Sequence, residues 1–156
     1  MYIKKGDLDA AMEHAKRLIE LNPNYPLAHE PLGRIYLKQR KYEEAVAEFQ
    51  KDVASDRTAY SLANLGHGYA IAGRRYEAMA VLKELEEKHK QGEALGQYAA
   101  SVYVGFGDTA QAFAWLEKDF QAHSGLLEFI IANPLFDSIR GDPRYANLLH
   151  RMGLKA

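Results

Sequence analysis

A short pattern of small and aromatic residues returns along this chain every 33 or 34 positions. It aligns residues 32–36 (LGRIY), 65–69 (LGHGY) and 99–103 (AASVY). In each copy a turn position follows the tyrosine by four residues, an alanine comes five residues later, and a large apolar residue comes four residues after that. The three sets are Arg40, Ala45 and Phe49; Gly73, Ala78 and Leu82; and Gly107, Ala112 and Leu116. A repeat of this length predicts a stack of similar units, each of which needs its neighbours to bury its apolar face.

The spacing within each unit predicts two antiparallel helices joined by a tight turn. A glycine inside a helix costs about 1 kcal/mol relative to alanine, so glycines near the middle of the first helix need a compensating gain. We expect that gain to come from close packing of the two helices. The small residues of the first helices should then face the alanines of the second helices, which pairs Gly33, Gly66 and Ala100 with Ala45, Ala78 and Ala112.

The repeat pattern predicts an all-α fold, a right-handed solenoid of antiparallel helix pairs with a C-terminal capping helix region. The 156 residues fit a single domain. Its expected segments are a partial repeat over residues 1–25, whole repeats over 26–58, 59–92 and 93–123, and the cap over 124–156. In the partial repeat Tyr2, Gly6, Ala11 and Ala15 are in register, and Asn22 and Pro23 close it.

The period stops at Ser124, and the remaining sequence predicts a different helical arrangement. We expect a short helix over residues 126–131, a turn at Asn133 and Pro134, and a terminal helix over residues 143–151. An aspartate followed by proline is typical of a helix start, and a glycine past the last helical residue is typical of its end. The apolar residues of this tail should cover the exposed core of the last repeat; they are Leu135, Phe136, Ile139, Tyr145, Leu148 and Leu149.

The first repeat is incomplete, because residues 2–4 correspond only to the last turn of a first helix. Part of the apolar face of the next helix should therefore lack cover; its members are Leu8, Met12, Leu18 and Ile19. Two explanations are compatible with this pattern. The sequence is a piece of a longer chain, or the face is buried in a homodimer.

Residues 2–122 resemble the tetratricopeptide repeat family, whose consensus of 34 residues carries Leu-Gly, Tyr, Gly, Ala, Phe and a closing proline in this order. Two features depart from that consensus. Asp52 and Asp119 stand where the family usually has alanine, and no proline closes the repeats after Ser55 and His89. The tail is similar to the ends of repeat regions attached to bacterial signalling proteins, such as winged-helix regulators, kinases and cyclases. This resemblance implies the C-terminal interaction module of a larger bacterial protein.

Composition argues against several classes of partner and compartment. The formal net charge is −1, so no basic field exists to bind a nucleic-acid backbone. The chain has no cysteine, which is consistent with a cytoplasmic location and excludes disulfides and thiolate sites. No run of apolar residues is long enough for a membrane span, so we expect no membrane insertion.

One stretch resembles a nucleotide-binding motif. Residues 105–110 (GFGDTA) match the dinucleotide fingerprint G-x-G-x-x-A at Gly105, Gly107 and Ala110, and residues 101–104 would have to be the preceding strand. A nucleotide-dependent enzyme is therefore one alternative. The repeat instead places Gly107 and Asp108 in register with Gly73 at a turn between helices, and no neighbouring segment is rich in strand-forming residues.

No other motif points to catalysis or to a metal. None of the six histidines stands in a His-Glu-x-x-His arrangement or at helical spacing from another histidine. No Gly-x-Ser-x-Gly motif occurs either. We therefore expect a non-catalytic protein that needs no metal and no cofactor.

The first helices of successive repeats should line an inner, concave wall, where we expect a protein or peptide to bind. Arg34 and Lys38 would attract an acidic side chain or a C-terminal carboxylate, Asn64 would bind a peptide backbone, and the tyrosines would supply apolar contact. The predicted groove residues are Lys4, Glu30, Arg34, Lys38, Tyr60, Asn64, His67, Gln97, Tyr98 and Ser101, with Leu37, Ile71 and Val104 beside them. The alternative is that homodimerisation is the function and that the groove is not used.

Overall fold

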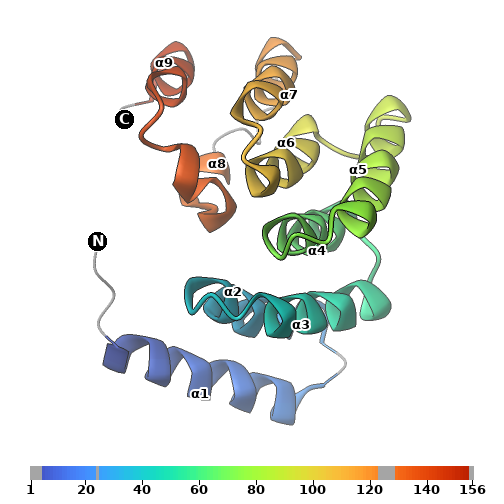
Figure 1. The fold of residues 1–156 in the computed structure, drawn as a ribbon, viewed down its shortest axis with the longest axis vertical. Helices are drawn as coiled ribbons and strands as arrows, with labels where there is room; N and C mark the ends of the chain where they lie inside the picture. The colour runs from blue at the N-terminus through green and yellow to red at the C-terminus, as the bar shows by residue number, and fades with distance from the viewer. Residues whose placement is uncertain (1–4, 24, 123–128, 155–156) are drawn as a thin grey trace.

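A computed structural model describes residues 5–23, 25–122 and 129–154, and within these ranges every regular element is a helix. The helices run in chain order around a curve, as Figure 1 shows. They are α1 (Lys5–Leu21), α2 (Glu30–Lys38), α3 (Tyr42–Ser55), α4 (Ala59–Ile71), α5 (Arg75–Lys90), α6 (Gly96–Phe106), α7 (Thr109–Gln121), α8 (Phe129–Ala132), the 3-10 helix η1 (Pro134–Ile139) and α9 (Pro143–Arg151). The predicted all-α repeat fold is confirmed.

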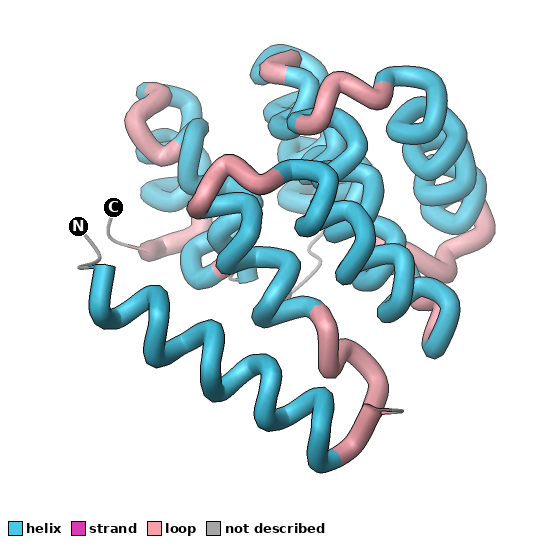
Figure 2. Tube along the Cα trace, turned by 60° about the horizontal axis from the view of Figure 1, so that its bottom comes forward, coloured by secondary structure: helices cyan, strands magenta, loops and turns pink. Residues whose placement is uncertain are grey.

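The middle of the chain forms three helix pairs joined by short loops (Figure 2). Helices α2 and α3 lie within residues 26–58, α4 and α5 within 59–92, and α6 and α7 within 93–123. Each pair packs together, and α4 also packs extensively against α6 of the next pair. One continuous apolar core results, which runs from Ala45 and Phe49 through Leu82 and Leu116 to Leu149 in the cap.

The three predicted turn positions lie between the helices of each pair and share a left-handed backbone. The φ angle is 58° at Arg40, 76° at Gly73 and 74° at Gly107. Glycine adopts this conformation without steric cost, whereas a residue with a Cβ does not. The prediction of one tight turn per repeat is therefore confirmed.

The glycines of the first helices permit close packing, but their nearest neighbours are not the expected alanines. A Cβ on Gly33 would lie 2.5 Å from the Phe49 ring, one helical turn past Ala45. A Cβ on Gly66 would lie 2.7 Å from Val102 and 2.9 Å from Val81. The residues that need the space are therefore large apolar side chains, because they fill the contact more completely than alanine does.

The N-terminal helix is partly covered on its apolar face. The repeat register places Gly6 at the turn position of the partial repeat. Helix α1 instead begins at Lys5, so Gly6 lies in its first helical turn and the prediction of a turn there is wrong. Residues 2–4 lie outside the described ranges. Leu8, Met12 and Ile19 pack against a small cluster that includes Leu32 and Ile35 of α2. These three were expected to lack cover and are partly buried, because α2 supplies the contact. Exposed apolar residues remain at the end of α1, where Leu18 is 40% and Leu21 is 76% exposed.

The C-terminal segment covers the last repeat, with one difference from the prediction. Helix α9 has the predicted bounds, and its Asp142 side chain accepts a hydrogen bond from the Arg144 amide at 2.9 Å. Instead of ending in a simple turn, the backbone after Asn133 continues as the 3-10 helix η1, because the Asn133 side chain caps it at the Leu135 amide (3.1 Å). The beginning of the helix predicted over 126–131 lies outside the described residues, and α8 accounts for its end.

The nucleotide-binding alternative is wrong at the level of fold. Residues 101–104 lie inside α6 and not in a strand, and the described residues contain no sheet. Gly107 ends α6, and Asp108 begins α7 by accepting a hydrogen bond from the Gln111 amide at 3.1 Å. The glycine-rich stretch is the turn that the repeat requires. Among the described residues, no helix has the length and apolar character that crossing a membrane requires.

Candidate functional site

Two neighbouring pockets lie on the inner side of the curve. Figure 1 shows α4 and α6 facing the inside, α5 and α7 outside them, and the segment from α8 into η1 within the curve. The first pocket, named here the tyrosine pocket, is lined by Leu27, Tyr60, Ala63, Asn64, Gln97, Tyr98, Ser101, Asn133, Leu135 and Phe136. The second, named here the basic pocket, is lined by Arg34, Leu37, Lys38, His67, Ile71, Val104, Gly105, Phe106, Gly107, Pro134, Leu135, Asp137 and Ser138. Leu135 belongs to both linings, so the pockets adjoin at η1.

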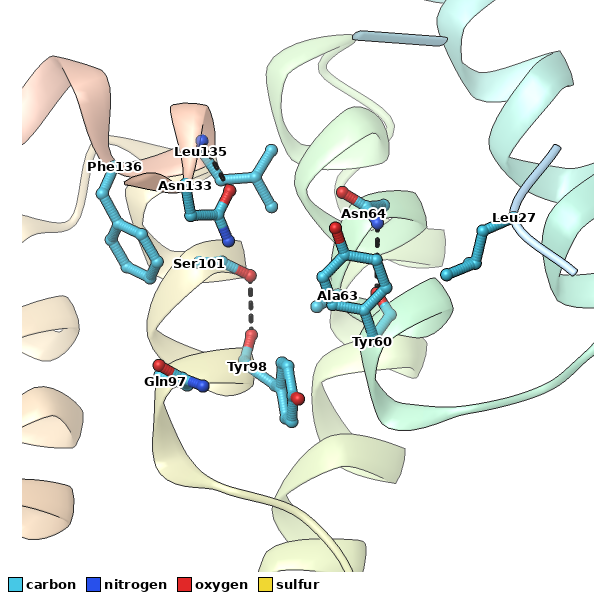
Figure 3. A pocket seen from close by; sticks show the side chains of 10 residues that line it. All are labelled: Leu27, Tyr60, Ala63, Asn64, Gln97, Tyr98, Ser101, Asn133, Leu135 and Phe136. Carbon is cyan, nitrogen blue, oxygen red and sulfur yellow. Dashed lines mark hydrogen bonds between the residues drawn. The ribbon is translucent and has the colours of Figure 1, made fainter. Parts of the chain in front are cut away.

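The tyrosine pocket has a volume of about 360 Å³ and lies between α4, α6 and η1 (Figure 3). The rings of Tyr60 and Tyr98 meet edge to face, with centroids 6.4 Å apart and an interplanar angle of 83°. Burial raises the pKa of both tyrosines above the ordinary value, so both remain neutral at physiological pH. No residue of this lining carries a charge, and its character is that of an apolar pocket with a few polar groups.

Polar side chains on the pocket wall are held by the helix backbone. Asn64 Nδ2 donates a hydrogen bond to the Tyr60 carbonyl oxygen at 3.3 Å, and Ser101 Oγ donates one to the Tyr98 carbonyl oxygen at 2.8 Å. The amide oxygens Asn64 Oδ1 and Gln97 Oε1 are closed to solvent and have no hydrogen-bond partner among the described residues. Buried acceptors without partners are uncommon in folded proteins. These two oxygens are therefore the chemically unusual feature of this pocket.

The basic pocket has a volume of about 510 Å³ and carries two cations with different surroundings. Arg34 pairs with Glu30 one turn earlier, and its Nη2 donates to the Tyr60 hydroxyl at 2.9 Å and to Asn133 Oδ1 at 3.5 Å. The Tyr60 hydroxyl in turn donates to Glu30 Oε1 at 3.0 Å. Lys38 is exposed and forms no ion pair with any residue in the described ranges. The carboxylate in this lining, Asp137, pairs with Arg140 at 2.8 Å, so the positive charge available to a ligand is mainly that of Lys38.

His67 lines the basic pocket but contributes no positive charge there. It is buried, and burial lowers its pKa to about 4. The neutral ring must donate from Nδ1 to its neighbour, the Ser101 carbonyl oxygen at 2.7 Å, because a carbonyl oxygen only accepts. His67 thus connects α4 to α6 and has a structural role.

The structure brings most of the predicted groove residues to these two pockets. Arg34, Lys38 and His67 line the basic pocket, together with the neighbouring Leu37, Ile71 and Val104. Five of the others line the tyrosine pocket: Tyr60, Asn64, Gln97, Tyr98 and Ser101. Glu30 lines neither pocket but holds Arg34 and Tyr60. Lys4 lies outside the described residues.

Five lining residues of the tyrosine pocket were not predicted by the repeat spacing. Leu27 belongs to the loop before α2, Ala63 to α4, and Asn133, Leu135 and Phe136 to the segment that begins η1. Leu135 and Phe136 were recognised as apolar, but only as cover for the last repeat. A turn signal such as Asn133-Pro134 indicates where the chain bends, and it does not indicate which surface the following residues reach.

The comparison with family models agrees with this geometry. Residues 2–65 match a model described as tetratricopeptide repeat. The comparison with curated proteins found no match. Tetratricopeptide repeats generally act as scaffolds for interactions between proteins, and the family is typically non-catalytic. Residues 2–65 are therefore similar to tetratricopeptide repeats, and the all-helical repeat fold is consistent with that similarity.

Proposed function

We propose that this chain is a non-catalytic scaffold that binds a protein or peptide segment along its concave side. The observation that carries the proposal is the adjacency of the tyrosine pocket and the basic pocket, which meet at Leu135. A segment lying across both would place an apolar group in the first and an acidic group beside the second. Binding pockets are typically apolar with a small number of polar groups that fix orientation.

An acidic group on the ligand would be attracted by the positive charge in the basic pocket. Lys38 is unpaired within the described residues, whereas the charge of Arg34 is largely balanced by Glu30. An acidic side chain or a C-terminal carboxylate would find a charge partner in Lys38. Tyr60 and Tyr98 offer contact area at little cost in conformational entropy, because each has only two side-chain torsions.

The experiment is a selection of peptides from a random library on the whole chain, followed by affinity measurement against Lys38→Glu. We expect selected peptides to carry an acidic residue and to bind the variant about threefold to tenfold more weakly, because an attraction becomes a repulsion. Arg34→Glu is less suitable, because it would place two carboxylates together and remove the bond to Tyr60. The matched control is Lys83→Glu, an exposed lysine on α5 that lines neither pocket.

Two outcomes would contradict this proposal. Selected peptides could bind Lys38→Glu as well as the unaltered chain, or their NMR chemical-shift changes could fall outside the two pockets. Either result would remove the concave side as the binding surface. Equal weakening by Lys83→Glu would show a general charge effect instead of a site.

We also propose that the chain serves as the C-terminal interaction module of a larger bacterial protein in the cytoplasm. The proposal starts from the resemblance stated above for the tail over residues 124–156, and the lack of cysteine is consistent with it. The reading frame upstream of residue 1 tests it. An attached effector domain is the expected finding, and a stop codon directly upstream would contradict it.

A second candidate function is homodimerisation through α1. The specific observation in its favour is the exposure of Leu18 and Leu21 near the end of this helix, followed by the exposed Tyr25 in the next loop. Clustered apolar exposure is typical of interaction surfaces. This function does not require the concave pockets, so the two candidates are tested separately.

A further inference from the structure

The tyrosine pocket contains two buried hydrogen-bond acceptors that nothing in the described structure satisfies. Asn64 is 2% exposed and Gln97 is 6% exposed, and both line the pocket. Neither Asn64 Oδ1 nor Gln97 Oε1 has a partner among the described residues. A buried polar group without a hydrogen bond is unfavourable, so a ligand that supplies a donor gains from pairing with it.

The orientation of the Asn64 amide is determined by its surroundings. Its nitrogen faces the Tyr60 carbonyl oxygen at 3.3 Å, and two oxygens would repel each other in that position. The unpaired atom of Asn64 is therefore the oxygen, and it needs an N–H or O–H donor. Figure 3 shows this oxygen on the side of Asn64 that is turned towards Leu135 of η1.

The rest of the lining restricts which donor fits. The tyrosine pocket has no charged side chain, so a cation would lose its hydration without gaining a counter-ion. Aromatic and aliphatic groups surround the space, and the edge-to-face pair of Tyr60 and Tyr98 shows how a planar ring packs against this wall. The complementary ligand is therefore uncharged, planar and apolar apart from an N–H group.

We propose that the tyrosine pocket binds an uncharged aromatic ring that carries an N–H donor, as an indole ring does, and that Asn64 Oδ1 accepts the hydrogen bond. This rests on the proposed function, because the ring would belong to a side chain of the bound segment. Asn64 Oδ1 is closed to solvent, so a lining side chain must move before the ring can reach it, and Leu135 of η1 is one of the side chains in this lining. The segment that begins η1 thus helps to determine ligand specificity.

The experiment uses two isomeric probes, 3-methylindole and 1-methylindole, which have the same size and differ in the presence of the N–H. Each is titrated into the whole chain and followed by NMR through the side-chain amides of Asn64 and Gln97. We expect 3-methylindole to bind about threefold to tenfold more tightly, as one hydrogen bond to a buried acceptor predicts. We expect the Asn64 amide signals to move only with 3-methylindole.

Two variants test whether Asn64 causes the preference for 3-methylindole over 1-methylindole. Asn64→Leu removes the acceptor and should abolish the difference between the two probes, whereas Asn147→Leu, at an exposed asparagine of α9, should preserve it. Equal affinity of the two probes for the unaltered chain would overturn the inference, and so would a preference that survives in Asn64→Leu. If Asn64→Leu fails to fold, the probe comparison and the Asn64 signals of the unaltered chain still decide.

The inference and the proposed function fail in different ways. If neither probe binds but selected acidic peptides still depend on Lys38, the ring specificity is wrong and the concave binding surface stands. If 3-methylindole binds as expected while peptides ignore Lys38, the tyrosine pocket recognises its ligand without the basic pocket.

Discussion

One residue with a left-handed backbone forms the turn of each helix pair, and at Arg40 this conformation costs conformational free energy. The turns of the second and third pairs use Gly73 and Gly107, while the first uses Arg40, although all three have φ angles between 58° and 76°. The left-handed region costs an L-residue with a Cβ about 1–2 kcal/mol relative to glycine. The repeat therefore retains its geometry at Arg40 against local preference, because the surrounding helices impose it.

Replacing Arg40 by glycine should stabilise the protein. The relief of backbone strain exceeds the extra entropy that glycine gives the unfolded chain, so we expect a gain of about 0.5–1 kcal/mol in the free energy of unfolding. Urea denaturation followed by circular dichroism measures it. Gly73→Ala is the matched control with opposite sign: its Cβ would meet no atom within 4 Å, so its expected loss of about 1 kcal/mol reports backbone strain alone. A destabilised Arg40→Gly would contradict this account.

The repeat spacing predicts the position of several site residues but not their charge or their partners. The repeat spacing placed Arg34, Asn64 and Ser101 on the inner helices, and the structure puts all three in the pocket linings. Spacing could not show that His67 would be buried and neutral, because its pKa depends on the packing of α6 over α4. It also could not show that Arg34 would be paired with Glu30 while Lys38 stays unpaired within the described ranges.

At the scale of the element, the beginnings of the first helices are capped in two ways. Helix α4 carries its own capping box, in which Thr58 and Ser61 exchange hydrogen bonds between side chain and backbone. Helices α2 and α6 are capped from the end of the second helix of the same pair. Asp52 Oδ1 accepts from the His29 amide at 3.0 Å, and the two oxygens of Asp119 accept from the Gly96 and Gln97 amides at 2.7 and 2.6 Å. The two departures from the repeat consensus thus replace a local cap with one from a neighbouring helix.

The two aspartates accept different numbers of hydrogen bonds, so we expect their replacement by asparagine to change the stability by different amounts. Asp119→Asn loses one of two acceptors, so we expect a loss of about 1–3 kcal/mol in the free energy of unfolding. Asp52→Asn should change it by less than about 0.5 kcal/mol, because only Oδ1 accepts a bond and Oδ2 has no hydrogen-bond partner among the described residues. Burial raises the pKa of both carboxyls, so the contrast between the two variants rests on the number of hydrogen bonds. Thermal denaturation of both variants measures the contrast. Equal losses would show that charge, and not the number of acceptors, determines the effect.

At the scale of the whole molecule, the two ends of the solenoid are finished differently. At the C-terminal end, Ile130, Phe136 and Leu149 join the main core, so the tail is continuous with the repeats. At the N-terminal end, α1 packs through a small separate cluster with α2 and leaves Leu21 exposed. Another molecule that covered Leu18 and Leu21 of α1 would remove apolar surface from water.

If α1 forms a homodimer interface, Leu21→Glu should disrupt it. Light scattering at two protein concentrations should show a mass that rises with concentration for the unaltered chain and stays that of one chain for the variant, because a carboxylate would be buried without a partner. Tyr76→Glu, at an exposed tyrosine of α5, is the control that should leave the mass unchanged. A single-chain mass at both concentrations for the unaltered protein would exclude this interface.

The sequence by itself determined the helix pairs, the turn at Arg40, Gly73 and Gly107, and the inner position of the first helices, because these follow from short-range periodicity and backbone preference. Only the tertiary structure decided where η1 lies, how Asp119 caps α6, and which large side chains fill the space beside Gly33 and Gly66. Those features depend on the rotation and offset of helices that meet across long stretches of chain. Packing determines such offsets through the shapes of many side chains together, which no single repeat specifies.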